Sequence, residues 1–334
     1  MAKRQIAAAA LALTLSAPLA HAQEIEVIMA LPAPTLTFSS AFIAEAAGFY
    51  KQAGLKVTHR NLVGVASVNA VIAGSADFTI GTGPVYLRAA AQGQRLLTIL
   101  NLIDRPLVEM VMRKDVADAA GITEKSPFAD RAKALKGKTI GIQGVGSIVH
   151  AWQRLVTARA GLDIEKDVRI APMDPPAMLP AMENKAIDGY ATSLPFTTQA
   201  VTKGAAIMLA SGVTDAPDLI PIAYGLVQTK PETCAQQRDK CVKITQALKN
   251  ANMMIINKPD EALALLKKMP NFSNMDPDLI AAAFKVVVQA HAKDMRVTLA
   301  GLEHSQQVSL EAKLLKPEDA LKSYDGLATD EFAK

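Results

Sequence analysis

The sequence repeats one order of landmark residues in two segments, and this internal match constrains the fold more than any single motif. The matched pairs are Ser40 with Ser147, Gly54 with Gly161, Asp77 with Asp188, Pro84 with Pro195, and Gly93 with Gly204. The first two pairs are 107 residues apart, and the other three are 111 residues apart. Such self-similarity is typical of repeated structural units. We therefore expect two similar units.

Each half alternates predicted strands with predicted helices. The first half has expected strands at residues 24–30, 55–59, 77–81 and 96–102, and expected helices at 39–53, 65–74 and 84–93. The second half has expected strands at 138–143, 168–171, 187–192 and 205–210, and expected helices at 148–160, 177–184 and 195–204. This alternation builds a parallel sheet with helices on both faces. The predicted fold class is α/β, with two doubly wound lobes.

Two strand-like runs lie where the chain must pass between the lobes. They are residues 107–113 (LVEMVMR) and 222–228 (IAYGLVQ), and each follows the last strand of its half. After residue 229 the pattern is helical, with helices expected at 239–256, 259–268, 277–292 and about 301–315. The sequence thus predicts two crossover strands and a helical C-terminal part.

Residues 1–22 are typical of a secretory signal peptide. Lys3 and Arg4 precede a short apolar run at residues 6–15, and Ala20-His21-Ala22 supplies the small residues of a cleavage site. No Cys follows that site, so we expect no lipid anchor. The mature chain should begin at Gln23 and should be periplasmic.

Composition excludes several classes of protein. The chain carries 36 Lys and Arg against 32 Asp and Glu, and its net charge of +4 falls to +2 without Lys3 and Arg4. This near-neutral balance, without a basic cluster interleaved with aromatics, argues against nucleic-acid binding. No apolar stretch after residue 22 approaches the ~20 residues that span a bilayer, so we expect a soluble mature protein. At ~150 residues per domain, the mature chain suffices for two domains.

The two cysteines, Cys234 and Cys241, are an even count in a chain expected to be exported, which favours a disulfide. In one continuous helix they would lie about 10 Å apart along the axis, beyond the ~7 Å limit for bridged Cα atoms. A bridge therefore requires a loop within residues 235–240. Two free thiols remain the alternative.

Ligands of open α/β sheets bind beyond the carboxyl ends of the strands. The loops at these ends carry hydroxyls, glycines and a few aromatic side chains, as expected of a polar cleft with an apolar wall. The candidate ligand-binding residues are Thr35, Thr37, Phe38, Ser39, Gly64, Val65, Thr82, Gly83, Asn101, Gln143, Val145, Gly146, Ser147, Asp174, Ser193, Phe196 and Tyr224.

The most specific of these loops is residues 141–147 (GIQGVGS), where a strand leads through glycines into a helix. Glycine lets backbone N–H groups approach a ligand, and the free N–H groups of a helix start favour an anion. The pattern is not the dinucleotide fingerprint. The sequence predicts anion or carboxylate capture here, and a tight turn capped by Ser147 is the alternative.

Catalytic and metal-binding constellations are absent from the sequence. The histidines have no metal-ligand spacing with one another or with cysteine, and no G-x-S-x-G motif occurs. We therefore expect no metal, no cofactor and no enzymatic activity.

With these features, the chain resembles the substrate-binding proteins of nitrate/taurine/sulfonate-type ABC importers, which are similar in fold to the pyrimidine-precursor synthases. The resemblance covers nearly all of the mature chain. It rests on residues 44–57 (AEAAGFYKQAGLKV), 72–78 (IAGSADF), 135–141 (LKGKTIG) and 186–189 (AIDG).

The resemblance implies a type II periplasmic binding protein, with lobe 1 at residues 23–104 and 219–334 and lobe 2 at residues 105–218. It implies a monomer that closes on a small-molecule ligand and delivers it to an ABC transporter permease. The expected solute is a small organic anion such as a carboxylate or a sulfonate. An enzyme of pyrimidine or cofactor biosynthesis on the same fold is the alternative.

Overall fold

The structure is a computed structural model that describes residues 24–333. The signal peptide predicted at residues 1–22 lies outside the described residues. The strands are β1 (Ile25–Leu31), β2 (Leu55–Asn61), β3 (Phe78–Gly81), β4 (Leu97–Asn101), β5 (Glu109–Arg113), β6 (Lys138–Ile142), β7 (Val168–Pro172), β8 (Gly189–Thr192), β9 (Ala206–Ser211) and β10 (Leu226–Thr229).

The helices lie before, between and after these strands. They are η1 (Leu36–Phe38), α1 (Ser39–Ala46), α2 (Phe49–Gln52), α3 (Val65–Ile72), α4 (Gly83–Ala91), α5 (Lys114–Ala119), α6 (Phe128–Lys133), α7 (Ile148–Arg159), α8 (Pro175–Glu183), α9 (Phe196–Thr202), α10 (Gly212–Asp215), η2 (Pro217–Leu219), α11 (Pro231–Gln236), α12 (Arg238–Asn257), α13 (Pro259–Leu266), α14 (Pro277–Ala290), α15 (Leu299–Glu311) and η3 (Pro317–Asp319).

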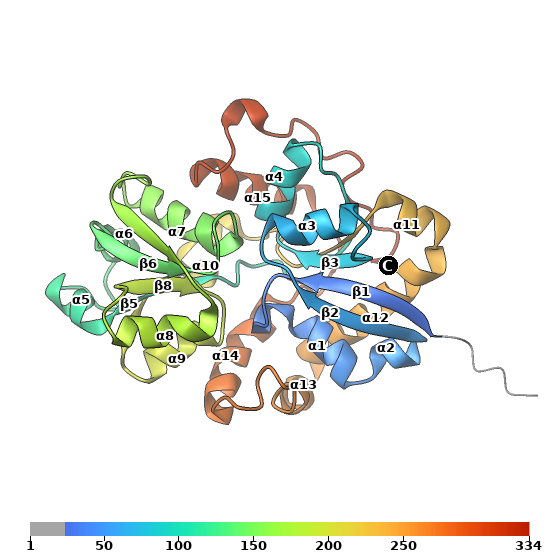
Figure 1. The fold of residues 1–334 in the computed structure, drawn as a ribbon, viewed down its shortest axis with the longest axis horizontal. Coiled ribbons are helices and arrows are strands. Elements are labelled where there is room, and N and C mark those ends of the chain that lie inside the picture. The colour runs from blue at the N-terminus through green and yellow to red at the C-terminus, as the bar shows by residue number, and fades with distance from the viewer. Residues whose placement is uncertain (1–23, 334) are drawn as a thin grey trace, which may run out of the picture.

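The strands form two sheets with the same order. The first sheet is β2-β1-β3-β10-β4 and the second is β7-β6-β8-β5-β9. Figure 1 shows the two sheets side by side, each with helices packed around it, the second sheet on the left and the first on the right. We call the first sheet with its helices the first lobe, and the second sheet with its helices the second lobe. The predicted two-lobed α/β architecture is confirmed.

Each sheet contains one antiparallel strand beside the parallel strands predicted for its half, and this strand comes from a predicted crossover run. β5 follows β4 along the chain but pairs antiparallel with β8 and β9 of the second sheet. β10 follows β9 but pairs antiparallel with β3 and β4 of the first sheet. The fifth strand of each half therefore belongs to the sheet of the other lobe. There each crossover strand lies between two other strands rather than at the edge of the sheet. The predicted lobe boundaries at residues 104/105 and 218/219 stay a prediction.

The helix predicted over residues 39–53 is interrupted. α1 ends before Gly48, whose φ of +73° belongs to the left-handed region, and α2 then begins at Phe49. Ser39, rather than Ser40, makes the bond equivalent to that of Ser147. The Oγ atoms of Ser39 and Ser147 each donate to the carbonyl three residues earlier, whereas the Oγ of Ser40 donates to Asn252.

Cys234 and Cys241 form a disulfide with their Cα atoms 5.5 Å apart. The helical path breaks between them, because α11 ends at Gln236 and α12 begins at Arg238. The bridge thus links the end of α11 to the first turn of α12, which packs on α1 and α2 of the first lobe.

The C-terminal helices connect the two lobes. α15 contacts α4 of the first lobe and α7 of the second, and α14 contacts both α12 and α9 (Figure 1). The largest hydrophobic core cluster includes residues of both sheets, among them Ile80 and Met110. Within residues 24–333, no helix is both long enough and apolar enough to cross a membrane.

Candidate functional site

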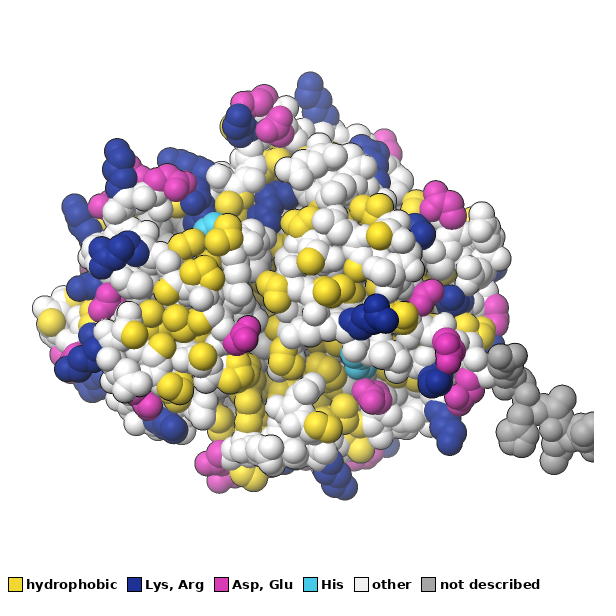
Figure 2. Space-filling model, in the orientation of Figure 1, with side chains coloured by type: hydrophobic (Ala, Val, Ile, Leu, Met, Phe, Trp, Pro, Cys, Tyr) yellow, Lys and Arg dark blue, Asp and Glu magenta, His cyan; other side chains and the backbone are white. Residues whose placement is uncertain are grey.

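A cavity lies between the two lobes, at the carboxyl ends of strands from both sheets. It contains about 550 Å³ of space that no atom fills, part of which is open to solvent. Figure 2 shows the seam between the lobes, with hydrophobic side chains on either side of it. The lining residues are Pro32, Ala33, Thr35, Thr37, Phe38, Val63, Gly64, Ser67, Val68, Gly81, Thr82, Val85, Tyr86, Gln143, Ser147, Ile148, Ser193, Tyr224 and Gln228.

The strand-to-helix loops of both lobes position the polar lining. Thr35 and Thr37 follow β1, and Thr82 joins β3 to α4. Ser147 joins β6 to α7, and Ser193 follows β8. Since parallel strands end at one edge of a sheet, each lobe presents its hydroxyls at the edge where ligands of such sheets bind. The cavity therefore has a polar lining contributed by both lobes.

Several lining polar atoms are buried and have no hydrogen-bond partner. They are the Oγ1 atoms of Thr35, Thr37 and Thr82, the hydroxyl of Tyr224, and Oε1 of Gln228. An unsatisfied buried polar group costs about 1–3 kcal/mol. Burial also raises the pKa of Tyr224, so that its hydroxyl stays protonated and available as a donor. Five such atoms around one cavity are the arrangement expected of a site that a polar ligand completes.

The glycine loop before α7 has a rigid geometry. Gly146 has a φ of +79°, in the left-handed region that favours glycine. Its backbone N–H donates to Nδ1 of His150 over 3.0 Å, and Ser147 Oγ donates to Gly144 O over 2.7 Å. Burial lowers the pKa of His150 to about 4, so the neutral ring can accept this bond. Ser147 is the N-cap of α7 and also lines the cavity.

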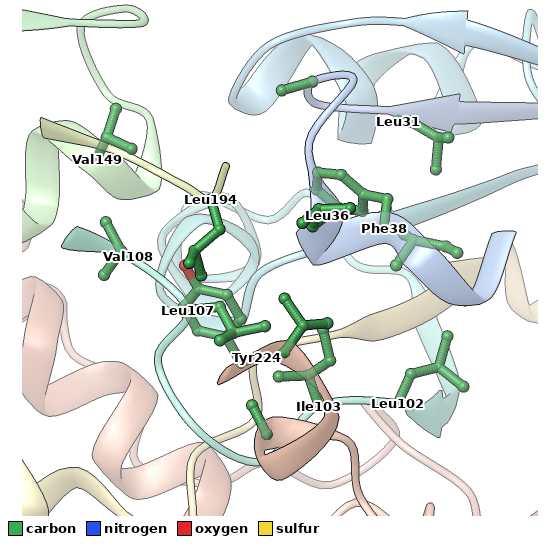
Figure 3. Close-up of a cluster of buried hydrophobic side chains, with 14 of the residues drawn as sticks. Leu31, Leu36, Phe38, Leu102, Ile103, Leu107, Val108, Val149, Leu194 and Tyr224 are labelled. Atoms are coloured by element: carbon green, nitrogen blue, oxygen red, sulfur yellow. The ribbon is translucent and has the colours of Figure 1, made fainter. Parts of the chain in front are cut away.

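Apolar side chains of both lobes pack together beside the cavity. Figure 3 shows Leu36 and Phe38 of the first lobe facing Leu194 of the second, with Tyr224 close by. The backbone N–H of Leu36 donates to the carbonyl of Leu194 over 3.0 Å. The lobes are therefore in direct contact beside the cavity.

Arg88 makes a second contact between the lobes. It lies on α4 of the first lobe and is 7% exposed. Its Nη2 donates to the carbonyl of Gly146 in the second lobe, while its Nη1 is buried without a partner. Burial lowers the pKa of this guanidinium. Arg88 thus joins α4 of the first lobe to the start of α7 in the second.

The structure brings about half of the predicted ligand-binding residues to this cavity. Those that line it are Thr35, Thr37, Phe38, Gly64, Thr82, Gln143, Ser147, Ser193 and Tyr224. Residues outside the lining are Ser39, Val65, Gly83, Asn101, Val145, Gly146, Asp174 and Phe196.

The residues outside the lining have other roles or positions. Asn101 donates through Nδ2 to the carbonyl of Ile222. Val145 is 68% exposed, and Asp174 is exposed at the start of α8. Gly83 donates its N–H to the carbonyl of Ala223. These residues lie in the predicted loops, but they either point away from the cavity or have their polar groups hydrogen-bonded to other residues.

Sequence reasoning did not predict two polar lining residues, Ser67 and Gln228. Ser67 lies on α3, and its Oγ donates to Gly64 O over 2.9 Å. Gln228 is fully buried in β10, which runs antiparallel between β3 and β4. A glutamine directly after two apolar residues of the strand (LVQT) was the available signal for it.

Charged and metal-binding groups are not part of this lining. None of the lining residues is Asp, Glu, Lys, Arg or His. Within residues 24–333, no three His, Cys, Asp or Glu side chains are grouped so that they could hold a metal ion. The site can therefore offer hydroxyls, amides, backbone N–H groups and apolar walls.

Two sheets of matching order that exchange one strand each, with a polar cavity between them, define the periplasmic binding protein fold, type II. A protein of this fold from Candida albicans aligns with a TM-score of 0.68 at 13% identity over 93% of this chain and 99% of that chain. The sequence profile described as NMT1/THI5 like matches residues 36–262. The chain belongs to this family.

Two other solved structures have the same fold. A protein from Bordetella bronchiseptica RB50 aligns with a TM-score of 0.76 at 21% identity, over 93% of this chain and 96% of that chain. The alkanesulfonate-binding protein SsuA from Xanthomonas axonopodis pv. citri, bound to MOPS, aligns with a TM-score of 0.68 at 18% identity, over 90% of this chain and 97% of that chain. No curated protein sequence matches this chain significantly.

Proposed function

We propose that this protein is the solute-binding component of an ABC importer and that it captures a small organic anion in the interlobe cavity. The observation that carries the proposal is the set of buried polar atoms without partners, the hydroxyls of Thr35, Thr37, Thr82 and Tyr224 and the amide oxygen of Gln228. A ligand that supplies their hydrogen bonds removes the cost of burying them. Structural similarity to a sulfonate-binding protein supports the same function.

The cavity favours an anion by means of neutral groups. The N-terminal ends of α3, α4 and α7 contribute Gly64, Thr82 and Ser147 to the lining. Helix N-termini present free N–H groups and a partial positive charge, which stabilise a bound anion. Hydroxyl donors complete the coordination of its oxygens. A carboxylate or sulfonate head group suits this arrangement, because each can accept several hydrogen bonds at once.

The proposed role is binding without turnover. A hydroxyl nucleophile needs an adjacent general base such as an imidazole, a carboxylate or an amine, and none of the lining residues carries one of these groups. We further propose that the mature protein is periplasmic and monomeric, that it binds no nucleic acid, and that it delivers its solute to a permease. The export signal predicted at residues 1–22 and the fold shared with periplasmic binding proteins support this location.

A thermal-shift screen of the purified mature protein tests the proposal. Its ligands are carboxylates, sulfonates, nitrate and pyrimidines. A true ligand at a hundredfold excess over its dissociation constant raises the free energy of unfolding by about 2.7 kcal/mol. The variant Thr82→Val should lose most of the shift, while Thr329→Val, on the C-terminal segment away from the cavity, should keep it.

The screen also separates binding from catalysis. Mass spectrometry of each hit after incubation should return the unchanged compound. Conversion of a hit to a product would instead support the enzyme alternative. A protein that shows no shift with any of these compounds would contradict the proposed function.

A further inference from the structure

One polar atom of the cavity differs in kind from the hydroxyls around it. Gln228 lies in β10 with its side chain 0% exposed, and it lines the cavity. Its Nε2 donates to Thr98 Oγ1 on β4 over 3.2 Å, while its Oε1 has no partner. The amide nitrogen of Gln228 therefore has a hydrogen-bond partner, whereas its amide oxygen has none.

The free oxygen lies beside Gly81, another lining residue. A Cβ added at Gly81 would lie 3.2 Å from Oε1 of Gln228, closer than most Cβ contacts. A larger residue at this position would therefore press on the amide oxygen. Glycine here keeps the space beside Oε1 free of a side chain.

This oxygen limits which ligands fit. A hydroxyl of Thr35, Thr37 or Thr82 can donate or accept, whereas an amide oxygen can only accept. Placing an anion's oxygen against Gln228 Oε1 would bring two acceptors together and leave both unsatisfied. A group that donates a proton is therefore required at this point. No carboxylate lines the cavity to balance an ammonium group, and an unpaired buried charge is costly.

We infer that the ligand is a small organic anion that also carries an uncharged O–H or N–H group, and that this group donates to Gln228 Oε1. Its site is the cavity of the proposed function, on which this assignment therefore rests. The ligand class excludes nitrate and unsubstituted alkyl sulfonates, which have no donor. It also excludes aliphatic amino sulfonates, whose donor is a cation.

Matched probes test this assignment by calorimetric titration. The probes are built on two anions, propanesulfonate and benzoate. Each anion is used in three forms: unsubstituted, with a hydroxyl opposite the anionic group, and with a methoxy group in place of that hydroxyl. Propanesulfonate with a terminal ammonium group completes the set. One neutral hydrogen bond to a buried acceptor corresponds to an affinity gain of up to about tenfold. We expect the hydroxyl form of at least one skeleton to bind about tenfold more tightly than its unsubstituted, methoxy and ammonium forms.

Gln228→Met should reduce this preference to about onefold, because methionine has no amide oxygen to accept the hydrogen bond. Gln153→Met is the matched control, since Gln153 is also buried and its Nε2 donates to a threonine hydroxyl, that of Thr157. It lies on α7 outside the lining and should keep the preference.

The outcomes separate two failures. Saturable binding without a preference for the hydroxyl form, or a preference that survives in Gln228→Met, would overturn the role of Gln228 and leave the proposed function standing. The wild-type comparison decides this even if a variant does not fold. No binding by any probe would contradict the proposed anion-binding function, and the assignment with it.

Discussion

Asp77 and Asp188 hold equivalent positions in the two lobes and make the same pair of hydrogen bonds. Oδ2 of Asp77 accepts from the N–H of Ile28 over 2.8 Å, and Oδ2 of Asp188 accepts from the N–H of Thr139 over 2.9 Å. Each aspartate also donates its own N–H to the carbonyl of the same partner, at 2.8 Å in both lobes. The 111-residue repeat in the sequence is therefore a repeat of hydrogen bonding as well.

Replacing either aspartate should destabilise its own lobe. Asp77→Ala and Asp188→Ala each leave a partly buried N–H unpaired, so we expect each to lower the free energy of unfolding by about 1–3 kcal/mol. The two effects should add, because the sites share no partner. Urea unfolding measures both losses. Asp130→Ala is the exposed control, because the ion pair of Asp130 with Lys133 is solvent-exposed. We expect this control to change the free energy of unfolding by under about 0.5 kcal/mol. Two variants as stable as the wild type would show that the repeated bonds are not stabilising.

Loss of Arg88 should weaken ligand binding without removing any group from the cavity lining. Arg88→Met removes a charge-assisted bond between the lobes, worth about 1.5–3 kcal/mol in the closed state. We expect affinity for the best anion of the screen to fall at least tenfold in calorimetric titration. Arg169→Met is the control, since Arg169 bonds only within the second lobe, to Thr139 and Gly137. Equal affinities of the two variants would argue against a closing role for Arg88.

Gly83 should tolerate no side chain. A Cβ at this position would lie 2.2 Å from the carbonyl oxygen of Ala223 and 2.3 Å from Oγ of Ser305. Because the carbonyl belongs to the backbone, α4 would have to shift, and we expect Gly83→Ala to cost about 2 kcal/mol or more. Gly144→Ala is the matched control, whose nearest contact is an ordinary 3.4 Å to Val63. Melting temperatures test the pair, and a Gly83→Ala protein as stable as the control would contradict this packing.

Glu109 should make stability fall as the pH rises. It lies on β5 between β8 and β9, and burial raises the pKa of its carboxyl to about 7, although the hydroxyl of Thr197 donates to it. In the unfolded chain its pKa is about 4.5. The folded state thus holds the proton more tightly than the unfolded state. The stabilisation that this proton contributes is complete below pH ~4.5, and about 3 kcal/mol of it is lost as the pH rises to ~7.

Urea unfolding at pH 5 and pH 8 isolates this effect by comparison with Glu109→Gln, which cannot ionise. The buried histidines His150 and His291 have lowered pKa values and act in the opposite direction, but they are common to both proteins. We expect the wild type to lose about 2.5 kcal/mol more than the variant across this range. Parallel pH profiles would contradict the buried position of Glu109.

Much of the fold was predictable from the sequence, because the repeat and the β/α alternation are local patterns. The pairing of β5 and β10 with the opposite sheets was not, since no local pattern tells which sheet a strand joins. Of the site residues, only those that lie in the loops at the ends of strands were predictable. Thr82 and Ser147 follow from that rule, whereas Gln228 reaches the cavity from the middle of an exchanged strand. Val145 lies in the right loop but is exposed to solvent, next to Gly146 with its left-handed φ.

A crystal structure of the protein with the tightest-binding anion of the screen is the most direct test of the central claim. Anionic oxygens within about 3 Å of the hydroxyls of Thr35, Thr37 or Thr82, inside the cavity between the lobes, are the predicted result. An anion bound elsewhere on the protein at saturating concentration, with this cavity unoccupied, would contradict it.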